Sequence, residues 1–313
     1  MKALILNEFG GVDNLIPTDI EIPAINDDQV LIKVKSISIN PVDAKTRAGK
    51  GMAARIQDKL PVILGWDISG EITKTGTAIT EYKIGDEVFG MLAFPELGNA
   101  YAEYVVANPS DITLKPKNIS HNEAAAATLA PLTAWQALTV HGNVKAGDRV
   151  FIHAGSGGVG HYAIQLAKHL GAYVIASSSA ANRDFVLSIG ADEHIDYQAK
   201  HFEEVVSNID FVLDTFSGDY IDRSLKILKK GGLIVSIVSS LNQDVAEKAA
   251  ALGITGKNML VYASGDEMKT LAALLEKGIL KSHVSKTYSF DQIPEAHLQI
   301  ESGRTVGKIV IEL

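Results

Sequence analysis

The feature that most constrains this chain is a glycine-rich segment between an apolar run and an amphipathic one. It matches the pattern G-x-G-x-x-G and comprises Gly155, Ser156, Gly157, Gly158, Val159 and Gly160. It directly follows VFIHA and precedes a stretch whose Ala163, Leu166, Ala167 and Leu170 share one helical face. Glycines here permit a tight turn, close approach of the backbone to a pyrophosphate, and close helix–strand packing. In this strand–loop–helix context the pattern predicts a dinucleotide-binding loop rather than a ligand-free turn.

The segment after the next apolar run, AYVIAS, indicates which dinucleotide binds. Sites for NAD usually place Asp or Glu there, to accept from the ribose 2′-OH. This chain has SSSAANR instead, and its first acid is Asp184. Hydroxyls, an amide and a guanidinium suit a 2′-phosphate, so we predict NADP. The predicted ligands are Ser177, Ser178, Asn182, Arg183 and Tyr197. The alternative is an ordinary polar helix start with Arg183 in solvent.

The rest of the chain is typical of two domains of different character. From residue 149 onward, six short apolar runs alternate with helical stretches or loops, which predicts a parallel, doubly wound α/β sheet. These runs are RVFIHAG, AYVIAS, EHIDY, DFVLDT, LIVSIV and NMLVYA. Residues 1 to about 115 instead contain short strand-like segments separated by turns. One is 30–35, where Val30, Ile32 and Val34 predict a half-buried strand; together the segments favour a barrel or sandwich.

The change between the two domains falls near Ser120. Ser120 and Glu123 form a capping-box pattern that predicts a helix start, the alanines at 124–127 continue the helix, and Pro131 is expected to interrupt it. After a helix near 266–277, the tail 282–313 again resembles strands. We therefore predict a discontinuous first domain, 1–119 completed by 280–313, around a dinucleotide-binding domain at 120–279.

Composition excludes several classes of protein. There are no cysteines, and the nine histidines show no metal-ligand spacing, so no metal site is predicted. The net charge is −8 without a basic cluster, which argues against nucleic acid. No apolar run approaches the ~18 residues of a membrane span, and the first residues are too short for a signal peptide. A cytoplasmic location is expected.

The chain resembles a known family along its whole length. The matching segments include SISINPVDAKTRAG, LGWDISGEI, KIGDEVFG, AYAEYV, AAAATLAPLTAWQAL, AGDRVFIHAGSGGVGHYAIQLAKHLGA, SIGADEHIDY and SGRTVGKIVI. Together they resemble the medium-chain dehydrogenase/reductase superfamily, in its zinc-independent quinone oxidoreductase branch. The resemblance implies a GroES-like barrel plus a Rossmann domain, with the active site in the cleft between them.

The resemblance also implies the chemistry. Zinc alcohol dehydrogenases of the superfamily carry Cys where this chain has Asn40, and Gly-His-Glu where it has Gly65-Trp66-Asp67. Two catalytic zinc ligands are therefore missing, and the four-cysteine structural zinc lobe has no counterpart. Hydride transfer from NADPH to a quinone or an α,β-unsaturated carbonyl is implied instead of alcohol oxidation.

Several residues match family positions near the reacting groups. Asn40 is implied to lie beside the nicotinamide and to donate to the substrate carbonyl; alternatively it caps the chain before Pro41. Asp43 is expected to order this loop rather than transfer a proton. Tyr101 is expected to line the pocket, or to pack on the barrel as strand tyrosines usually do. Thr133 is implied to lie near the nicotinamide, or to cap a helix.

Further residues complete the expected site. Asp214 and Thr215 match positions that contact the nicotinamide ribose, and Val238, at the end of LIVSIV, is assigned to the same cofactor site. Lys45 and Arg47 are interpreted as solvated charges, and Trp66 as a pocket wall or core residue. The segment 49–59 is a candidate lid or pocket wall.

Two rival functions and one assembly remain open. The first rival is an enoyl-thioester reductase of the same superfamily, and the second is a non-catalytic NADPH-binding protein. The apolar run NMLVYA is expected to be an edge strand that pairs with its copy in a homodimer.

Overall fold

The computed structural model describes residues 1–238 and 242–313, and these form two compact units. Unit 1 comprises Met1–Leu132 and Tyr262–Leu313; unit 2 comprises Thr133–Val261. The predicted boundaries at 119/120 and 279/280 differ from this division at both ends. Helix α3 (His121–Ala126) packs on β3, β5 and β16, and α10 (Gly265–Glu276) packs on β8, so both belong to unit 1.

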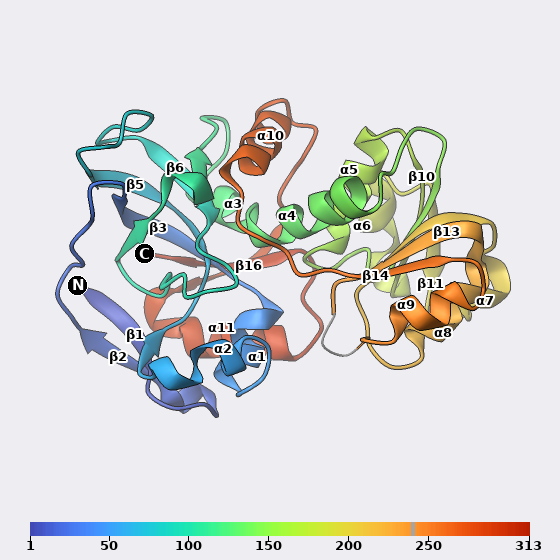
Figure 1. Cartoon of the computed structure of the whole chain (residues 1–313), viewed down its shortest axis with the longest axis horizontal. Helices are drawn as coiled ribbons and strands as arrows, with labels where there is room; N and C mark the ends of the chain where they lie inside the picture. The colour runs from blue at the N-terminus through green and yellow to red at the C-terminus, as the bar shows by residue number, and fades with distance from the viewer. Residues whose placement is uncertain (239–241) are drawn as a thin grey trace. The chain divides into compact units, whose positions relative to one another are not determined.

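Unit 1 is built mainly from strands (Figure 1). Its strands are β1 (Lys2–Leu6), β2 (Leu15–Asp19), β3 (Val30–Ile39), β4 (Val62–Ile63), β5 (Asp67–Thr75), β6 (Glu87–Met91), β7 (Tyr104–Ala107), β8 (Ile112–Leu114), β15 (Val284–Ser289) and β16 (Lys308–Glu312). Its other α-helices are α1 (Pro41–Arg47), α2 (Ala53–Ile56), most of α4 (Leu129–Trp135) and α11 (Ile293–Glu301). Short 3₁₀ turns cover Val12–Asn14, Gln57–Lys59, Pro109–Asp111 and Phe290–Gln292.

Two sheets enclose one apolar core in unit 1. The larger has the order β15-β16-β3-β5-β6-β8, with β7 also paired to β3, and the smaller has the order β2-β1-β4. Strand β3 is buried along most of its length; Leu31 lies inside together with Val30 and Ile32, and Lys33 is exposed. The GroES-like barrel fold therefore includes the C-terminal strands, because β16 pairs antiparallel with β3.

Unit 2 contains a six-stranded parallel sheet. Its strands are β9 (Arg149–Ile152), β10 (Tyr173–Ser178), β11 (Glu193–Asp196), β12 (Ile209–Asp214), β13 (Leu228–Ser236) and β14 (Thr255–Asn258). Its helices are α5 (Gly160–His169), α6 (Arg183–Ser188), α7 (Phe202–Val205), α8 (Tyr220–Ile227) and α9 (Val245–Ala250); a π-helix follows α4 at Gln136–His141 and a 3₁₀ turn covers Ala180–Asn182.

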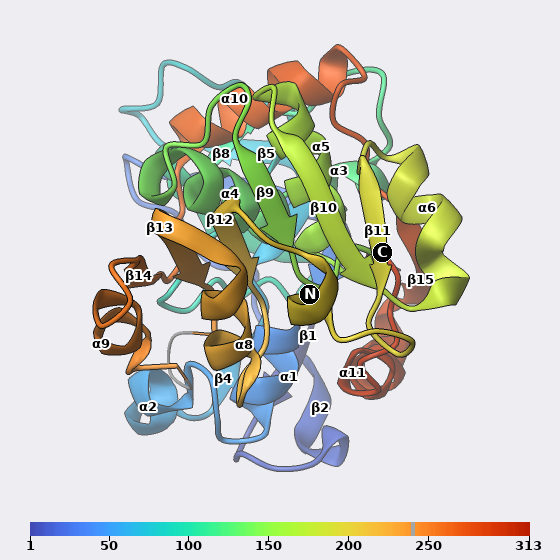
Figure 2. The same ribbon diagram turned by 90° about the vertical axis from the view of Figure 1, so that its right-hand side faces the viewer.

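The strand order is β11-β10-β9-β12-β13-β14 (Figure 2). The chain builds outward from β9 to β11, returns to the centre with β12, and builds outward again to β14. This is the doubly wound Rossmann order 3-2-1-4-5-6, and its switch point lies between β9 and β12. Helices α5 and α6 pack on β9–β11, and α8 and α9 pack on β12–β14.

Three local predictions need correction. The capping box at Ser120 and Glu123 is confirmed, but the helix break falls at 127–128; Pro131 lies in the first turn of α4, where a missing N–H costs little. The run NMLVYA is not a strand, since β14 ends at Asn258. The tail contains α11 as well as strands.

Candidate cofactor and catalytic residues

The glycine loop follows β9 and opens α5 within unit 2. Its backbone is tightly packed: a Cβ added at Gly160 would lie 2.1 Å from the Ala154 carbonyl oxygen. A Cβ at Gly155 would lie 2.8 Å from the Ala176 Cβ. Only glycine allows the strand, loop and helix to approach this closely. The ten-residue α5 begins at Gly160, so its first N–H groups and positive dipole end adjoin the loop, as a diphosphate requires.

The end of β10 is hydrogen-bonded to the glycine loop. The Gly155 N–H donates to the Ser177 carbonyl over 2.7 Å. The Asn182 amide donates to Ser156 Oγ over 3.1 Å and to Ser179 Oγ over 3.2 Å. Three of the predicted 2′-phosphate ligands, Ser177, Ser178 and Asn182, are thus brought next to the loop. The segment contains hydroxyls and an amide with no carboxylate among them, and Ser177 and Ser178 are buried.

The other two predicted ligands lie at the periphery of this segment. The Arg183 side chain is 62% exposed and lies 3.4 Å from Asp184, and Tyr197 is half exposed. Both side chains are accessible to solvent. Sequence reasoning missed His194, whose Nε2 lies 2.8 Å from Ser178 Oγ because β11 pairs parallel with β10. The sequence signal for His194 was its place in EHIDY, the third predicted strand of the sheet, which lies next to the second.

The predicted nicotinamide-side residues in unit 2 cluster at the end of β12. Asp214 Oδ2 accepts from Ser236 Oγ over 2.8 Å and from Asn242 Nδ2 over 3.0 Å. Burial raises the pKa of Asp214 to about 6. The Thr215 hydroxyl is buried and has no hydrogen-bond partner within 1–238 and 242–313. Asn242, which sequence reasoning missed, locks Asp214 in place.

The remaining predicted residues of unit 2 lie on separate elements. Val238, half-buried, follows β13, and Thr133 is buried at the fifth position of α4. Thr133 is therefore not a helix N-cap. His153 and His161, which flank the glycine loop, are both buried. Burial lowers the pKa of His153 to about 3, and Phe151, Phe202 and Tyr220 are among the rings around it.

In unit 1, Asn40 belongs to a buried polar cluster with Asp67 and Lys308. Asn40 is 1% exposed; its Nδ2 donates to Asp67 Oδ2 over 2.8 Å, and its Oδ1 accepts from Lys308 Nζ. Lys308 Nζ also lies 3.9 Å from Asp67 Oδ2. Burial lowers the pKa of Lys308 and raises the pKa of Asp67, while their mutual attraction opposes both effects. Lys308 reaches this cluster from the far end of the sequence.

Asp43 adjoins this cluster and caps α1. Its Oδ2 accepts from the Asn40 backbone N–H over 2.5 Å, so Asn40 occupies the N-cap position. Asp43 Oδ1 is buried and has no hydrogen-bond partner in the described part of the chain. Burial, assisted by the charge of Asp67, raises the pKa of Asp43 to about 8. The capping bond agrees with the expected ordering role.

A second buried chain of polar groups runs from Tyr101 to the surface. The Tyr101 hydroxyl lies 2.9 Å from His297 Nε2, and Arg47 Nε donates to His297 Nδ1 over 3.3 Å. Arg47 also donates to the Gly10 carbonyl and to Glu301. Because a guanidinium only donates, His297 Nδ1 must accept; the proton of the neutral ring therefore lies on Nε2 and is donated to Tyr101. The hydroxyl hydrogen of Tyr101 remains available to another acceptor.

These contacts decide between several alternatives. Arg47 is buried, so its interpretation as a solvated charge is wrong; Lys45 is exposed as expected. Tyr101 is fully buried, and burial with the Asp43 and Asp67 charges raises its pKa well above the usual value. Trp66 is a core residue whose Nε1 donates to the Glu96 carbonyl over 2.5 Å.

The segment 49–59 forms α2 and a 3₁₀ turn. Its Ile56 is buried in the barrel core, which anchors the segment to unit 1. No observation on the described residues tests its role as a lid, which stays a prediction.

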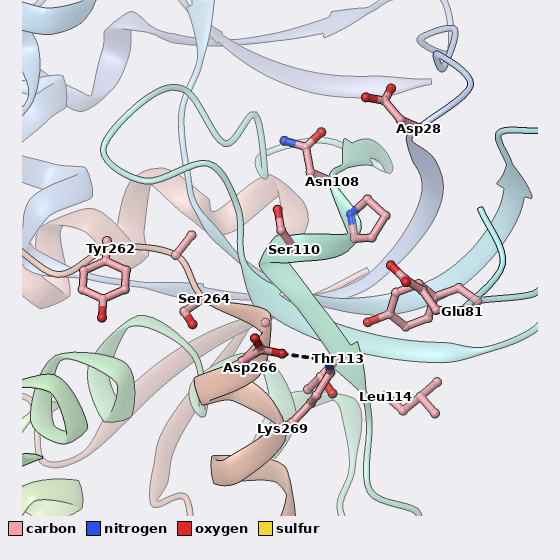
Figure 3. A pocket seen from close by; sticks show the side chains of 14 residues that line it. Asp28, Glu81, Asn108, Ser110, Thr113, Leu114, Tyr262, Ser264, Asp266 and Lys269 are labelled. Atoms are coloured by element: carbon pink, nitrogen blue, oxygen red, sulfur yellow. Dashed lines mark hydrogen bonds and ion pairs between the residues drawn. The ribbon is translucent and has the colours of Figure 1, made fainter. Parts of the chain in front are cut away.

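A pocket of about 1020 Å³ lies elsewhere on unit 1, beside the start of α10 (Figure 3). Its lining includes Asp28, Glu81 and Asp266, with Lys269 paired to Asp266 over 2.9 Å. None of the predicted site residues lines it.

Within the described ranges, no helix is long and apolar enough to cross a membrane.

A doubly wound sheet with a glycine loop, joined to a discontinuous barrel, defines the class of nucleotide-dependent dehydrogenases and reductases. Residues 26–117 match the alcohol dehydrogenase GroES-like domain, and residues 189–311 match the zinc-binding dehydrogenase family.

Relatives that match nearly the whole of this chain identify the family more closely. A 2-methylene-furan-3-one reductase from Solanum lycopersicum is 35% identical, over 99% of this chain and 79% of the relative. A chloroplastic NADPH-dependent alkenal/one oxidoreductase from Arabidopsis thaliana is 34% identical over the same shares. The solved quinone oxidoreductase from Coxiella burnetii superposes with a TM-score of 0.96 at 37% identity, covering 100% of this chain and 99% of that one. The chain belongs to the medium-chain dehydrogenase/reductase superfamily, in its quinone oxidoreductase branch.

Proposed function

We propose that this protein is an NADPH-dependent oxidoreductase that transfers a hydride to a quinone or an α,β-unsaturated carbonyl, without zinc. The observation that carries the proposal is the carboxylate-free end of β10, which hydrogen bonds attach to the glycine loop. Relatives of this chain are named as alkenal/one and quinone oxidoreductases, which supports the same acceptor class.

The chain's own residues divide into two binding regions. Gly155–Gly160 with the start of α5 would hold the diphosphate, and the hydroxyl, amide and guanidinium groups of 177–183 together with Tyr197 would hold the 2′-phosphate. Asp214, Thr215, Val238 and Thr133 would orient the nicotinamide half. When bound, NADPH supplies the hydride from its nicotinamide ring.

In unit 1, Asn40 would act as the hydrogen-bond donor to the acceptor's carbonyl oxygen. One Nδ2 hydrogen is used by Asp67, which leaves the other for substrate. Lys308 donates to the opposite end of the same carboxamide, which polarises it and strengthens Nδ2–H as a donor. Asp43 would fix the backbone of Asn40 by accepting its N–H, and Tyr101 would lie beside these two residues. Negative charge that develops on the oxygen would thus meet a fixed donor.

The residue types at the family's ligand positions support the proposed zinc independence. Asn40 and Trp66 offer no thiolate or imidazole, and the chain has no cysteine at all. An acceptor that is already electrophilic delocalises the incoming charge and needs no Lewis acid. Extensive dialysis against a chelator is expected to leave turnover unchanged.

The test is an NADPH-oxidation screen over quinones, enones, 2-alkenals and crotonyl-CoA. Turnover confined to crotonyl-CoA would replace the proposal with an enoyl-thioester reductase. Tight NADPH binding without turnover on any acceptor would replace it with a non-catalytic binding protein.

The cofactor assignment has its own variant. Arg183→Ala should raise the KM for NADPH about tenfold and leave the KM for NADH nearly unchanged, because only NADPH has a 2′-phosphate. Arg304→Ala, which removes another exposed arginine, is the matched control. Equal changes for both cofactors would show that Arg183 does not face the 2′-phosphate.

We also propose a cytoplasmic homodimer. Strand β14 (Thr255–Asn258) forms one edge of the unit 2 sheet, and an edge strand can pair with the same strand of a second copy. Light scattering at micromolar concentration tests this; a monomeric mass would exclude the dimer.

A further inference from the structure

We propose that His194 reads the 2′-phosphate in a proton-dependent way, so that the preference for NADPH over NADH increases as the pH falls. The inference rests on the proposed NADPH function and adds a residue that the cofactor motif does not contain. It is carried by the position of His194 next to Ser178 and by the hydrogen-bond roles that this contact imposes.

The position follows from the pairing of β11 with β10. These strands are parallel, with Ala176 opposite His194 and Ser178 opposite Asp196. The imidazole therefore lies one strand away from the end of β10, and its Nε2 is 2.8 Å from Ser178 Oγ. Ser178 belongs to the segment that Asn182 attaches to the glycine loop. His194 would thus adjoin the 2′ substituent of a ribose bound at the end of β10.

The hydrogen-bond roles decide the tautomer. Ser178 Oγ lies 3.1 Å from the Ser179 carbonyl, to which only the hydroxyl can donate. Since the hydroxyl has one hydrogen, Ser178 Oγ must accept from His194 Nε2–H. The neutral ring then carries its proton on Nε2 and a lone pair on Nδ1. No hydrogen bond to Nδ1 is found in the described ranges. Protonation would make Nδ1 a second donor without breaking the bond to Ser178.

The charges around His194 mean that a bound phosphate would decide the protonation state of its ring. Burial is the main factor that lowers its pKa, and the Arg183 guanidinium on α6 lowers it further. Asp196 on its own strand, together with the Ser178 backbone, raises it. Without cofactor the ring is therefore neutral near pH 7. A 2′-phosphate adds up to two negative charges at this end of the sheet and favours the imidazolium. NADH brings no such charge.

Linkage turns this into a measurable effect. NADPH binding would take up a proton on His194, so its affinity would gain as the pH falls through the window between the free and bound pKa values of that ring. Raising the pKa by one unit corresponds to at most a tenfold gain in affinity. The phosphate's own second ionisation, near pH 6, works in the opposite direction but is the same for every variant.

The experiment measures the Kd of NADPH and of NADH by cofactor fluorescence, from about pH 6 to about pH 8.5. Three proteins are compared: wild type, His194→Gln, and His169→Gln, which changes an exposed histidine of the same unit. His194→Gln keeps a donor for Ser178 but cannot be protonated. It should raise the Kd of NADPH about tenfold near pH 6 and less than twofold near pH 8.5, with NADH unaffected.

Each outcome decides one question. A ratio of variant to wild-type Kd that is the same at both pH values, or an equal change for NADH, overturns the role of His194. Wild-type protein that binds NADH as tightly as NADPH overturns the proposed cofactor instead. If His194→Gln does not fold, the His194 Cε1 NMR titration in wild-type protein decides: NADPH should raise the pKa of His194 and NADH should not.

Discussion

Asp43→Asn tests the electrostatics of the buried cluster around Asn40. Burial raises the pKa of Asp43 to about 8 from 3.8, so the folded protein binds a proton that the unfolded chain releases. Each pH unit corresponds to ~1.4 kcal/mol, so holding this proton at pH 7 costs about 4 kcal/mol. Asparagine is neutral, and its Oδ1 can still accept from the Asn40 backbone N–H. The new amide donors lack partners, which offsets ~1–2 kcal/mol of the gain.

The direction of the pH effect follows from the raised pKa. The stability that a protonated Asp43 contributes is fully present below pH 3.8 and is lost as the pH rises through about 8. Wild-type stability should therefore fall relative to Asp43→Asn by about 1.4 kcal/mol per pH unit between pH 4 and 8. At pH 7 the variant should be more stable by roughly 2–3 kcal/mol.

The assay is urea unfolding followed by fluorescence at several pH values. Unit 1 contains Trp66 and unit 2 contains Trp135. A Trp135→Phe background therefore lets Trp66 report on unit 1 alone. Asp58→Asn, which neutralises an exposed carboxylate, is the matched control and should run parallel to wild type. The reasoning is refuted if the Asp43→Asn and wild-type curves are also parallel from pH 4 to 8.

Three further perturbations test other parts of the structure. Gly160→Ala should abolish NADPH binding in a titration, because its Cβ has no room; Gly11→Ala, where a Cβ meets nothing within 4 Å, should bind normally. Tyr101→Phe leaves His297 Nε2–H without its acceptor and should lower the free energy of unfolding by ~1–3 kcal/mol; an unchanged urea midpoint would show that this hydrogen bond does not stabilise unit 1. The pKa of His153 lies at about 3 when folded, so its stabilising contribution is present above pH 6.5 and is lost as the pH falls toward 3. His153→Phe should flatten that loss in acid unfolding curves, and an unchanged acid midpoint would show that another group controls it.

The fold was largely predictable from local pattern. Five of the six parallel strands, the glycine loop and the return of the C-terminal strands to the first unit follow from hydrophobic periodicity and turn residues. The errors occurred where tertiary packing outweighs local sequence. Helices α3 and α10 pack on barrel strands, so both domain boundaries differ from the predicted ones. The run NMLVYA extends beyond the end of the last strand, because only Thr255–Asn258 pair with β13.

The candidate site divides in the same way. Residues 155–160 and 177–183 lie within one β-α-β unit, so their proximity follows from chain connectivity, and the sequence alone predicts a 2′-phosphated dinucleotide there. Sequence reasoning missed His194 and Asn242, because strand pairing places His194 beside Ser178 and because Asn242 meets Asp214 from 28 positions further along the chain.

The polar network of unit 1 depends entirely on the tertiary structure. Arg47 meets His297 across 250 positions, and Lys308 meets Asn40 across 268. From the sequence alone, these charged and polar side chains would be expected to be exposed to solvent. Their burial, and hence the shifted pKa values of Asp43 and Lys308, arises only when the C-terminal strand pairs with β3 and excludes solvent. Periodicity and glycine spacing are short-range properties, whereas desolvation of a charge depends on everything that packs around it.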